Sequence, residues 1–343
     1  MYNLVEKRTN NMYLADKERY SRMKYSNCGR SGLMLPKIAL GFWHNFGELN
    51  DYKTMKELVF TAFDNGVTYF DLANNYGPEN GAAEESFGRI FNQELKGYRD
   101  EMIIATKAGY PMWDGPYGDG GSRKYLMASL DQSLKRMGIS YVDIFYHHRM
   151  TKDTPLEETM LALADIVRQG KALYIGLSKY DAPTLRKATE MLHNLHVPFI
   201  VNQNRYNIID RTNIDNGVID TSLELGQGNV VFSPLAQGLL TDRYLNGIPE
   251  DSRMRHDPRY LKESALTPEL LDKLVALNNI AKERNEKLAD MALEWILKDN
   301  KVTSCIIGAS KKEQILINCK AIDGQDFSQD QLKRIDDIVL GKK

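Results

Sequence analysis

Four polar side chains of this sequence lie at or just after the ends of short apolar segments. In chain order they are Asp71, Tyr76, Lys107 and His148. A carboxylate, a phenol, an ammonium group and an imidazole are the groups needed to protonate a carbonyl oxygen. Their types and positions therefore predict an active site that acts on a carbonyl compound.

Each of these four side chains has an expected role. We expect Tyr76 to donate the proton, because an ammonium group at about 4 Å, from Lys107, should lower the phenol pKa by roughly three units. Asp71 would hold Lys107, and a neutral His148 would donate a hydrogen bond to the substrate oxygen. Each residue alone also has a structural alternative, such as a buried ion pair or a tyrosine that packs a turn. By residue type His147 could equally be the active-site histidine, and strand alternation turns only one of the two histidines inward.

Composition limits the class of protein. The chain has 343 residues, is 42% hydrophobic and 27% charged, and carries a net charge of −1, as expected of a soluble globular protein without a general attraction to nucleic acid. No apolar run approaches the roughly 20 residues of a membrane span, and the N-terminus lacks a signal-peptide core. Cys28, Cys305 and Cys319 lack metal-site spacing and suit a reducing compartment. We expect a cytoplasmic protein without a metal.

Short apolar segments alternate with amphipathic stretches along the chain. The amphipathic stretches predict helices, one of them opened by a capping box from Thr154 to Glu157 with Pro155 at its first position. Eight apolar segments are expected to be strands, at residues 38–42, 68–72, 102–106, 142–146, 173–177, 199–202, 230–232 and 304–307.

Eight strand-helix rounds predict an α/β fold, a (β/α)8 TIM barrel. The alternative, an open doubly wound sheet, lacks its G-x-G-x-x-G signature here. Residues 25–35 are expected to form an N-terminal β-hairpin at the barrel bottom, and the polar residues 241–265 a binding loop over the upper face. We expect residues 1–24 to be an N-terminal extension, and 25–343 a single barrel domain with extra C-terminal helices. The four polar side chains can meet at the C-terminal strand ends.

The chain resembles the aldo-keto reductases. Residues 70–77, Phe-Asp-Leu-Ala-Asn-Asn-Tyr-Gly, match the catalytic loop of that family, and Lys107 matches its strand-end lysine. His148 follows Asp143 by five residues, a register that selects it over the preceding histidine. The likeness extends from about residue 25 to 340. It is strongest to the branch that holds bacterial L-glyceraldehyde 3-phosphate reductases and potassium-channel β subunits, and the reductases are nearer because the channel subunits have asparagine at the histidine position.

The resemblance implies an NADP(H) cofactor across the barrel mouth. It assigns the nicotinamide carboxamide to Ser178 and Gln203 and stacking of the ring to Phe232. The other implied contacts are Trp43, Ser233, Leu235, Gly238, Arg243, Arg253, Gly308, Ser310, Lys311, Gln314 and Asn318. The last of these belong to a strand-helix junction whose backbone N–H groups favour a phosphate. Helix capping or barrel packing is the alternative role for several of them.

Three positions depart from the family pattern. Lys179 stands where many members have asparagine, which puts one carboxamide contact in doubt. Ala309 replaces a lysine, although Lys311 supplies charge two residues later, so binding of the 2′-phosphate is still expected. Ile317 stands where an acidic residue often holds the adenine amine, which should weaken that contact.

The substrate side is predicted from the same resemblance. Trp43, Tyr110 and Trp113 are expected to wall an aldehyde pocket beside Tyr76 and His148. The basic residues of the neighbouring loops are expected in a solvated helix start and a loop-to-loop ion pair, with a substrate phosphate as the alternative partner. These residues are Arg123, Lys124 and Arg149.

The predicted function is NADPH-dependent reduction of small aldehydes, such as glyceraldehyde 3-phosphate and methylglyoxal, by a homo-oligomer of four or more chains. A first alternative is a cofactor-sensing regulatory protein like the channel β subunits, against which His148 argues. A second is an isomerase or aldolase that forms a Schiff base on Lys107, against which the neighbouring Asp71 argues.

Overall fold

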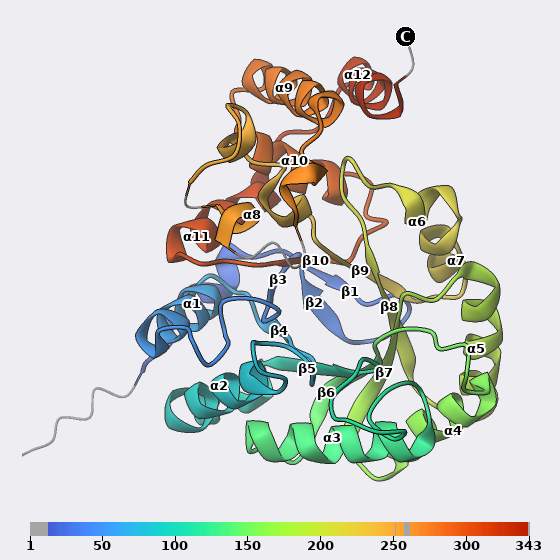
Figure 1. The fold of residues 1–343 in the computed structure, drawn as a ribbon. Helices are drawn as coiled ribbons and strands as arrows, with labels where there is room; N and C mark the ends of the chain where they lie inside the picture. Colours follow the sequence, from blue (N-terminus) through green and yellow to red (C-terminus); the bar gives the residue numbers. More distant parts are fainter. Residues whose placement is uncertain (1–12, 251, 257–260, 342–343) are drawn as a thin grey trace, which may run out of the picture.

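Eight parallel strands close into a barrel in the order β10-β3-β4-β5-β6-β7-β8-β9 (Figure 1). The computed structural model describes residues 13–250, 252–256 and 261–341. The barrel strands are β3 (Ile38–Gly41), β4 (Tyr69–Asp71), β5 (Ile103–Ala108), β6 (Val142–His147), β7 (Ala172–Ser178), β8 (Phe199–Arg205), β9 (Gly228–Phe232) and β10 (Ser304–Ile307). The predicted TIM barrel is confirmed, since each expected segment contributes one strand. Most strand residues are buried, as parallel strands covered by helices require.

Helices cover the outside of the barrel (Figure 1). Their caps follow from the sequence: the Ser122 side chain accepts a hydrogen bond from the Tyr125 N–H at the start of α3, and Gly138 ends that helix at φ 65°. The capping box expected at Thr154 is absent, because Pro155 has an extended ψ of 132° and the helix begins one residue later. The helices are α1 (Tyr52–Asp64), α2 (Ala82–Ile90), α3 (Arg123–Met137), α4 (Leu156–Arg168), α5 (Ala182–Asn194), α6 (Thr212–Asp215), α7 (Val218–Glu224), α8 (Arg253–His256), α9 (Pro268–Glu283), α10 (Leu288–Leu297), α11 (Lys312–Lys320) and α12 (Gln329–Leu340).

The expected hairpin consists of β1 (Tyr25–Asn27) and β2 (Met34–Pro36). Its turn meets the N-terminal ends of barrel strands: the Arg30 N–H donates to the Gly226 carbonyl at 2.8 Å, and Cys28 is fully buried with Sγ 3.3 Å from the Ile200 carbonyl. The hairpin therefore covers the bottom of the barrel, as predicted.

The polar stretch at residues 241–265, of which residues 251 and 257–260 lie outside the described part, contains buried apolar side chains. Tyr244, Met254 and Leu261 are buried in it and anchor it to the core, and α8 lies within it. Farther along the chain, α9 and α12 lie side by side at one edge (Figure 1). Among the residues that the structure describes, no helix is long and apolar enough to cross a membrane.

Candidate active site

The Lys107 ammonium group lies at the centre of the four polar side chains. It is fully buried and 2.6 Å from Asp71 Oδ2, 2.8 Å from the Leu72 carbonyl oxygen and 3.5 Å from the Tyr76 hydroxyl. These three acceptors match the three protons of an ammonium group. Because an ammonium group only donates, the Tyr76 oxygen accepts, and the phenol keeps its own proton for another acceptor.

The other Asp71 oxygen is held from the far side of the barrel. Gln203 of β8 donates from Nε2 to Asp71 Oδ1 at 2.9 Å. The sequence resemblance assigned this glutamine only to the cofactor. Strands β4 and β8 are not neighbours, so the contact crosses the barrel interior and could not be read from sequence spacing.

The pKa of Tyr76 departs from the expectation. Burial raises the pKa of its phenol well above the ordinary value, and the Asp71 charge adds to this. The expected lowering of this pKa by Lys107 does not prevail. Asp71, at 2.6 Å from the Lys107 nitrogen, offsets the ammonium charge, and the half-buried phenol loses contact with water. Tyr76 therefore stays protonated, which its predicted role as proton donor requires.

His148, directly after β6, contacts Tyr76 through its ring. Its ring lies 5.7 Å from the Tyr76 ring and 4.7 Å from the Tyr110 ring, edge to face in both cases. Burial first, and then the Lys107 charge, lower the pKa of His148 well below the ordinary value. Its buried Nδ1 has no hydrogen-bond partner in the described part of the chain, so we assign the proton of the neutral ring to Nε2.

His147 points elsewhere. Its Nδ1 lies 2.6 Å from the Tyr180 hydroxyl, and burial lowers its pKa to about 4. The structure thus brings His148, and not His147, to Tyr76.

The buried His147 predicts a pH dependence of stability. In the folded protein the pKa of His147 lies below its unfolded value of roughly 6.5, so the unfolded chain takes up a proton first as the pH falls. The contribution of the neutral His147 to stability is therefore complete above pH roughly 6.5 and is lost as the pH falls toward about 4. Relative to a His147→Gln variant, the wild type should lose about 1.4 kcal/mol of unfolding free energy per pH unit in that window. Urea unfolding of both proteins at several pH values checks this. A difference that does not change with pH would contradict it.

Tyr110 lies between two cations at the barrel mouth. Lys179 Nζ is 2.6 Å from its hydroxyl, and the Arg149 guanidinium carbon is 4.5 Å from its ring centroid. Arg149 also forms an ion pair with Asp119 at 2.8 Å across two loops, the structural role that the sequence favoured. Lys179 approaches the Phe232 ring as well, at 5.4 Å.

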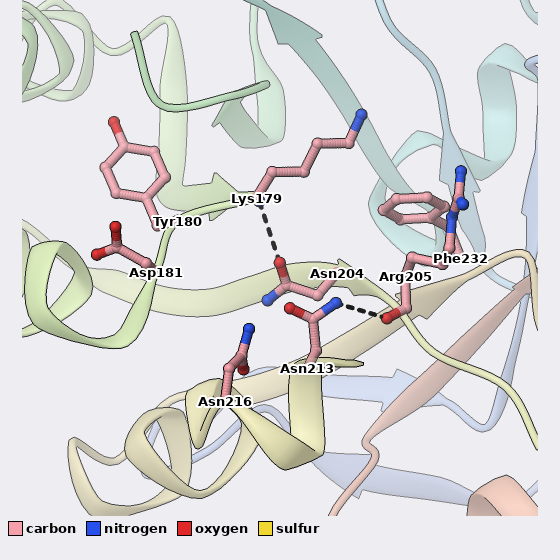
Figure 2. A pocket seen from close by; sticks show the side chains of 8 residues that line it. All are labelled: Lys179, Tyr180, Asp181, Asn204, Arg205, Asn213, Asn216 and Phe232. Atoms are coloured by element: carbon pink, nitrogen blue, oxygen red, sulfur yellow. Dashed lines mark hydrogen bonds between the residues drawn. The ribbon is translucent and has the colours of Figure 1, made fainter. Parts of the chain in front are cut away.

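The stem of Lys179 helps to line a pocket of about 370 Å³ (Figure 2). Asn204 is buried beneath it, and its Oδ1 accepts a hydrogen bond from the Lys179 N–H at 3.2 Å. Its Nδ2 has no partner among the described residues. Figure 2 shows the Lys179 side chain running away from Asn213 and Asn216 at the other end of the pocket.

The remaining predicted substrate-side residues contact aromatic rings or an acidic side chain. The centroid of the Trp113 ring lies 5.2 Å from that of Tyr125, and the Tyr125 hydroxyl donates to the Tyr110 carbonyl at 2.6 Å. Trp113 is thus linked to Tyr110 at the barrel mouth through Tyr125. Trp43 follows β3 and packs on the His44 ring at 4.2 Å. Arg123 forms an ion pair with Asp165, and Lys124 lies over the Tyr117 ring, which is the structural role expected for this helix start.

Two of the predicted nicotinamide contacts offer room for a ligand. Ser178 ends β7 and is fully buried, and its hydroxyl has no hydrogen-bond partner within the described residues. Phe232 ends β9 and is only partly buried, with its ring in the pocket of Figure 2. An unsatisfied buried hydroxyl at the end of β7 and a partly exposed ring at the end of β9, with β8 between them, suit a flat ligand that carries an amide. These residues therefore fit a nicotinamide.

The predicted pyrophosphate residues follow β9. Ser233 and Gln237 have left-handed φ values of 55° and 59°, and Gly238 has φ 99°, a conformation that favours glycine. Leu235 is half-buried and Arg243 lies in the short helix η5 (Asp242–Tyr244). Arg253 begins α8, but its side chain lies outside the described residues.

The last predicted junction precedes α11. Gln314 Oε1 accepts from the Ser310 N–H at 2.8 Å and from the Lys311 N–H at 3.2 Å, so these two backbone donors of the junction are already used. Gly308 and Lys311 are exposed, whereas Asn318 is only 4% exposed. A phosphate at these two N–H groups would have to displace Gln314.

Comparison with known proteins agrees with this geometry. The aldo/keto reductase family model matches residues 37–340. L-glyceraldehyde 3-phosphate reductases of Escherichia coli O157:H7 and K12 are each 52% identical over 331 residues, which are 96% of this chain and 96% of each relative. A probable voltage-gated potassium channel subunit beta of Oryza sativa subsp. japonica is 37% identical over 306 residues, 88% of this chain and 92% of the relative.

Proposed function

Because the chain belongs to the aldo/keto reductase family, we propose that it reduces small aldehydes, including glyceraldehyde 3-phosphate and methylglyoxal, to alcohols with NADPH. The observation that carries the proposal is the Lys107 contact pattern, which leaves the Tyr76 proton free for a substrate oxygen. A bound NADPH supplies the hydride. Ser178, Gln203 and Phe232 would hold its nicotinamide.

Each of the four side chains has its own role in proton transfer to the carbonyl group. Tyr76 donates its proton to the oxygen that becomes an alcohol, and this oxygen is far more basic than the phenolate that remains. Lys107 stabilises the phenolate by charge, and Asp71 holds Lys107 in place. The neutral His148 donates a hydrogen bond that orients the carbonyl group.

The Schiff-base alternative does not suit this geometry. A Schiff base needs a lone pair on the Lys107 nitrogen, whereas all three ammonium protons face acceptors. Burial lowers the pKa of Lys107, and the Asp71 charge opposes this effect.

The proposal is tested by following NADPH absorbance with methylglyoxal, glyceraldehyde and glyceraldehyde 3-phosphate. We expect consumption of NADPH with one or more of these aldehydes. Binding of NADPH without turnover on any of them would favour the second candidate, a cofactor-sensing protein, for which the similarity to the potassium channel subunit beta is the supporting observation.

We further propose that Lys179 binds the phosphate of phosphorylated substrates. Arg123 and Arg149 are held by Asp165 and Asp119, whereas Lys179 reaches Tyr110, whose ring contacts His148. It thus offers positive charge close to the carbonyl site. The L-glyceraldehyde 3-phosphate reductases among the relatives act, by their name, on such a substrate.

Replacing Lys179 with methionine should therefore raise the KM for glyceraldehyde 3-phosphate by roughly 10- to 100-fold, because a hydrogen bond to a charged group contributes about 1.5–3 kcal/mol. The KM for methylglyoxal, which has no phosphate, should change little. The matched control is Lys124→Met, which removes the lysine over the Tyr117 ring and should change neither of the two KM values. Equal losses for both aldehydes, or a raised KM for NADPH alone, would assign Lys179 to another role.

Two broader properties stay predictions. We propose a cytoplasmic location, which suits three buried free cysteines. We also propose a homo-oligomer of four or more chains, which light scattering of the purified protein would test.

A further inference from the structure

Two tyrosines lie beneath the ion pair of the site. The Tyr69 hydroxyl is 3.3 Å from Asp71 Oδ1, the oxygen that also accepts from Gln203, and the Tyr69 and Tyr146 hydroxyls are 2.8 Å apart. Both phenols are fully buried. Neither has been given a role in the reaction above.

The direction of these hydrogen bonds follows from the carboxylate. Asp71 Oδ1 can only accept, so the single Tyr69 proton points to it and Tyr146 must donate to Tyr69. Burial first, and then the Asp71 charge, raise the pKa of Tyr146 well above the ordinary value, so its hydroxyl keeps the proton that it donates. Asp71 Oδ1 thus accepts from the Gln203 amide and from Tyr69, which in turn accepts from Tyr146. In such a chain of hydrogen bonds each donor polarises the next and strengthens it.

The barrel makes room for this arrangement. Tyr146 pairs with Gly176 of β7, and a Cβ at Gly176 would lie 2.3 Å from Tyr146 Cε1. Only glycine therefore allows the ring to lie there. The same ring lies 5.6 Å from Lys107 Nζ, within the range of a cation–π contact.

We propose that Tyr69 and Tyr146 are positioning residues, whose linked hydroxyls hold the Asp71 carboxylate so that its other oxygen fixes Lys107 beside Tyr76. This inference rests on the proposed function of Tyr76 as the proton donor. It assigns the two tyrosines to proton transfer, through Asp71 and Lys107, and not to binding of substrate or cofactor.

The test compares Tyr69→Phe, Tyr146→Phe and the double variant with the wild type. Tyr69→Phe should lower kcat about tenfold, the effect of one hydrogen bond to a charged group, and Tyr146→Phe should lower it less. The double variant should resemble Tyr69→Phe, because the two hydroxyls act in one chain. The KM for the aldehyde and the Kd for NADPH should change less than about twofold, since both phenols are fully buried beneath the ion pair. The solvent deuterium isotope effect on kcat should increase as proton transfer slows.

The matched control is Tyr25→Phe. Its hydroxyl donates to the Gly66 carbonyl at 2.7 Å in the hairpin at the opposite end of the barrel, so its loss should lower stability without changing kcat or the isotope effect. Unchanged kcat and isotope effect in both site variants, or the same changes in Tyr25→Phe, would overturn the inference. Tyr146→Phe carries the test should Tyr69→Phe fail to fold. Absence of aldehyde reduction in the wild type would instead refute the proposed function.

Discussion

Tyr76→Phe should lower kcat for aldehyde reduction by roughly 10²- to 10⁴-fold, the usual contribution of a positioned general acid. The phenylalanine ring keeps the packing against His148 but has no proton to give. The affinity for NADPH should therefore stay close to that of the wild type. Steady-state rates with methylglyoxal, together with NADPH titration, measure both quantities.

The control for this variant is Tyr117→Phe. Tyr117 belongs to the loop between β5 and α3 and is 57% exposed, so the loss of its hydroxyl should leave kcat unchanged. If Tyr76→Phe retained wild-type activity, the acid would have to be another group.

Lys107→Met should damage both activity and stability. It leaves the Asp71 carboxylate, only 2% exposed, without its cation, and an uncompensated buried charge costs about 3–5 kcal/mol of unfolding free energy. We expect kcat to fall by at least about 100-fold as well, because the Tyr76 phenolate loses its stabilising charge. Urea unfolding and NADPH assays measure the two effects.

The double variant Asp71→Asn/Lys107→Met separates these effects. Removing both charges should recover most of the stability, since no unpaired charge remains, but it should not recover kcat. Recovery of activity together with stability would mean that the pair is only structural.

The fold was predictable because short buried strands have a simple signature. Each barrel strand is a short apolar segment, and a count of eight with helices between them leaves few arrangements other than a closed barrel. Asp71, Lys107 and His148 could be placed at one face because the C-terminal ends of parallel strands meet there. The bounds were less predictable, and β8 runs to Arg205, three residues beyond its predicted end at 202.

The contacts that tune the site were not predictable. Gln203 and Asp71 are 132 residues apart, and only the closed barrel brings them within 2.9 Å. A signal for Tyr69 did exist, since it lies two residues before Asp71 and strand alternation puts both side chains on the same face. The raised pKa of Tyr76 depends on burial, for which spacing gives no measure.

The most direct test of the account is deuterium transfer from NADPH that is labelled at the hydride position of its nicotinamide. Turnover of glyceraldehyde 3-phosphate or methylglyoxal by the wild type should give an alcohol with one deuterium on the former aldehyde carbon, and Tyr76→Phe should bind the cofactor but form almost no labelled product. An unlabelled alcohol, or labelled product formed by Tyr76→Phe at the wild-type rate, would contradict hydride transfer to a carbonyl group that Tyr76 protonates.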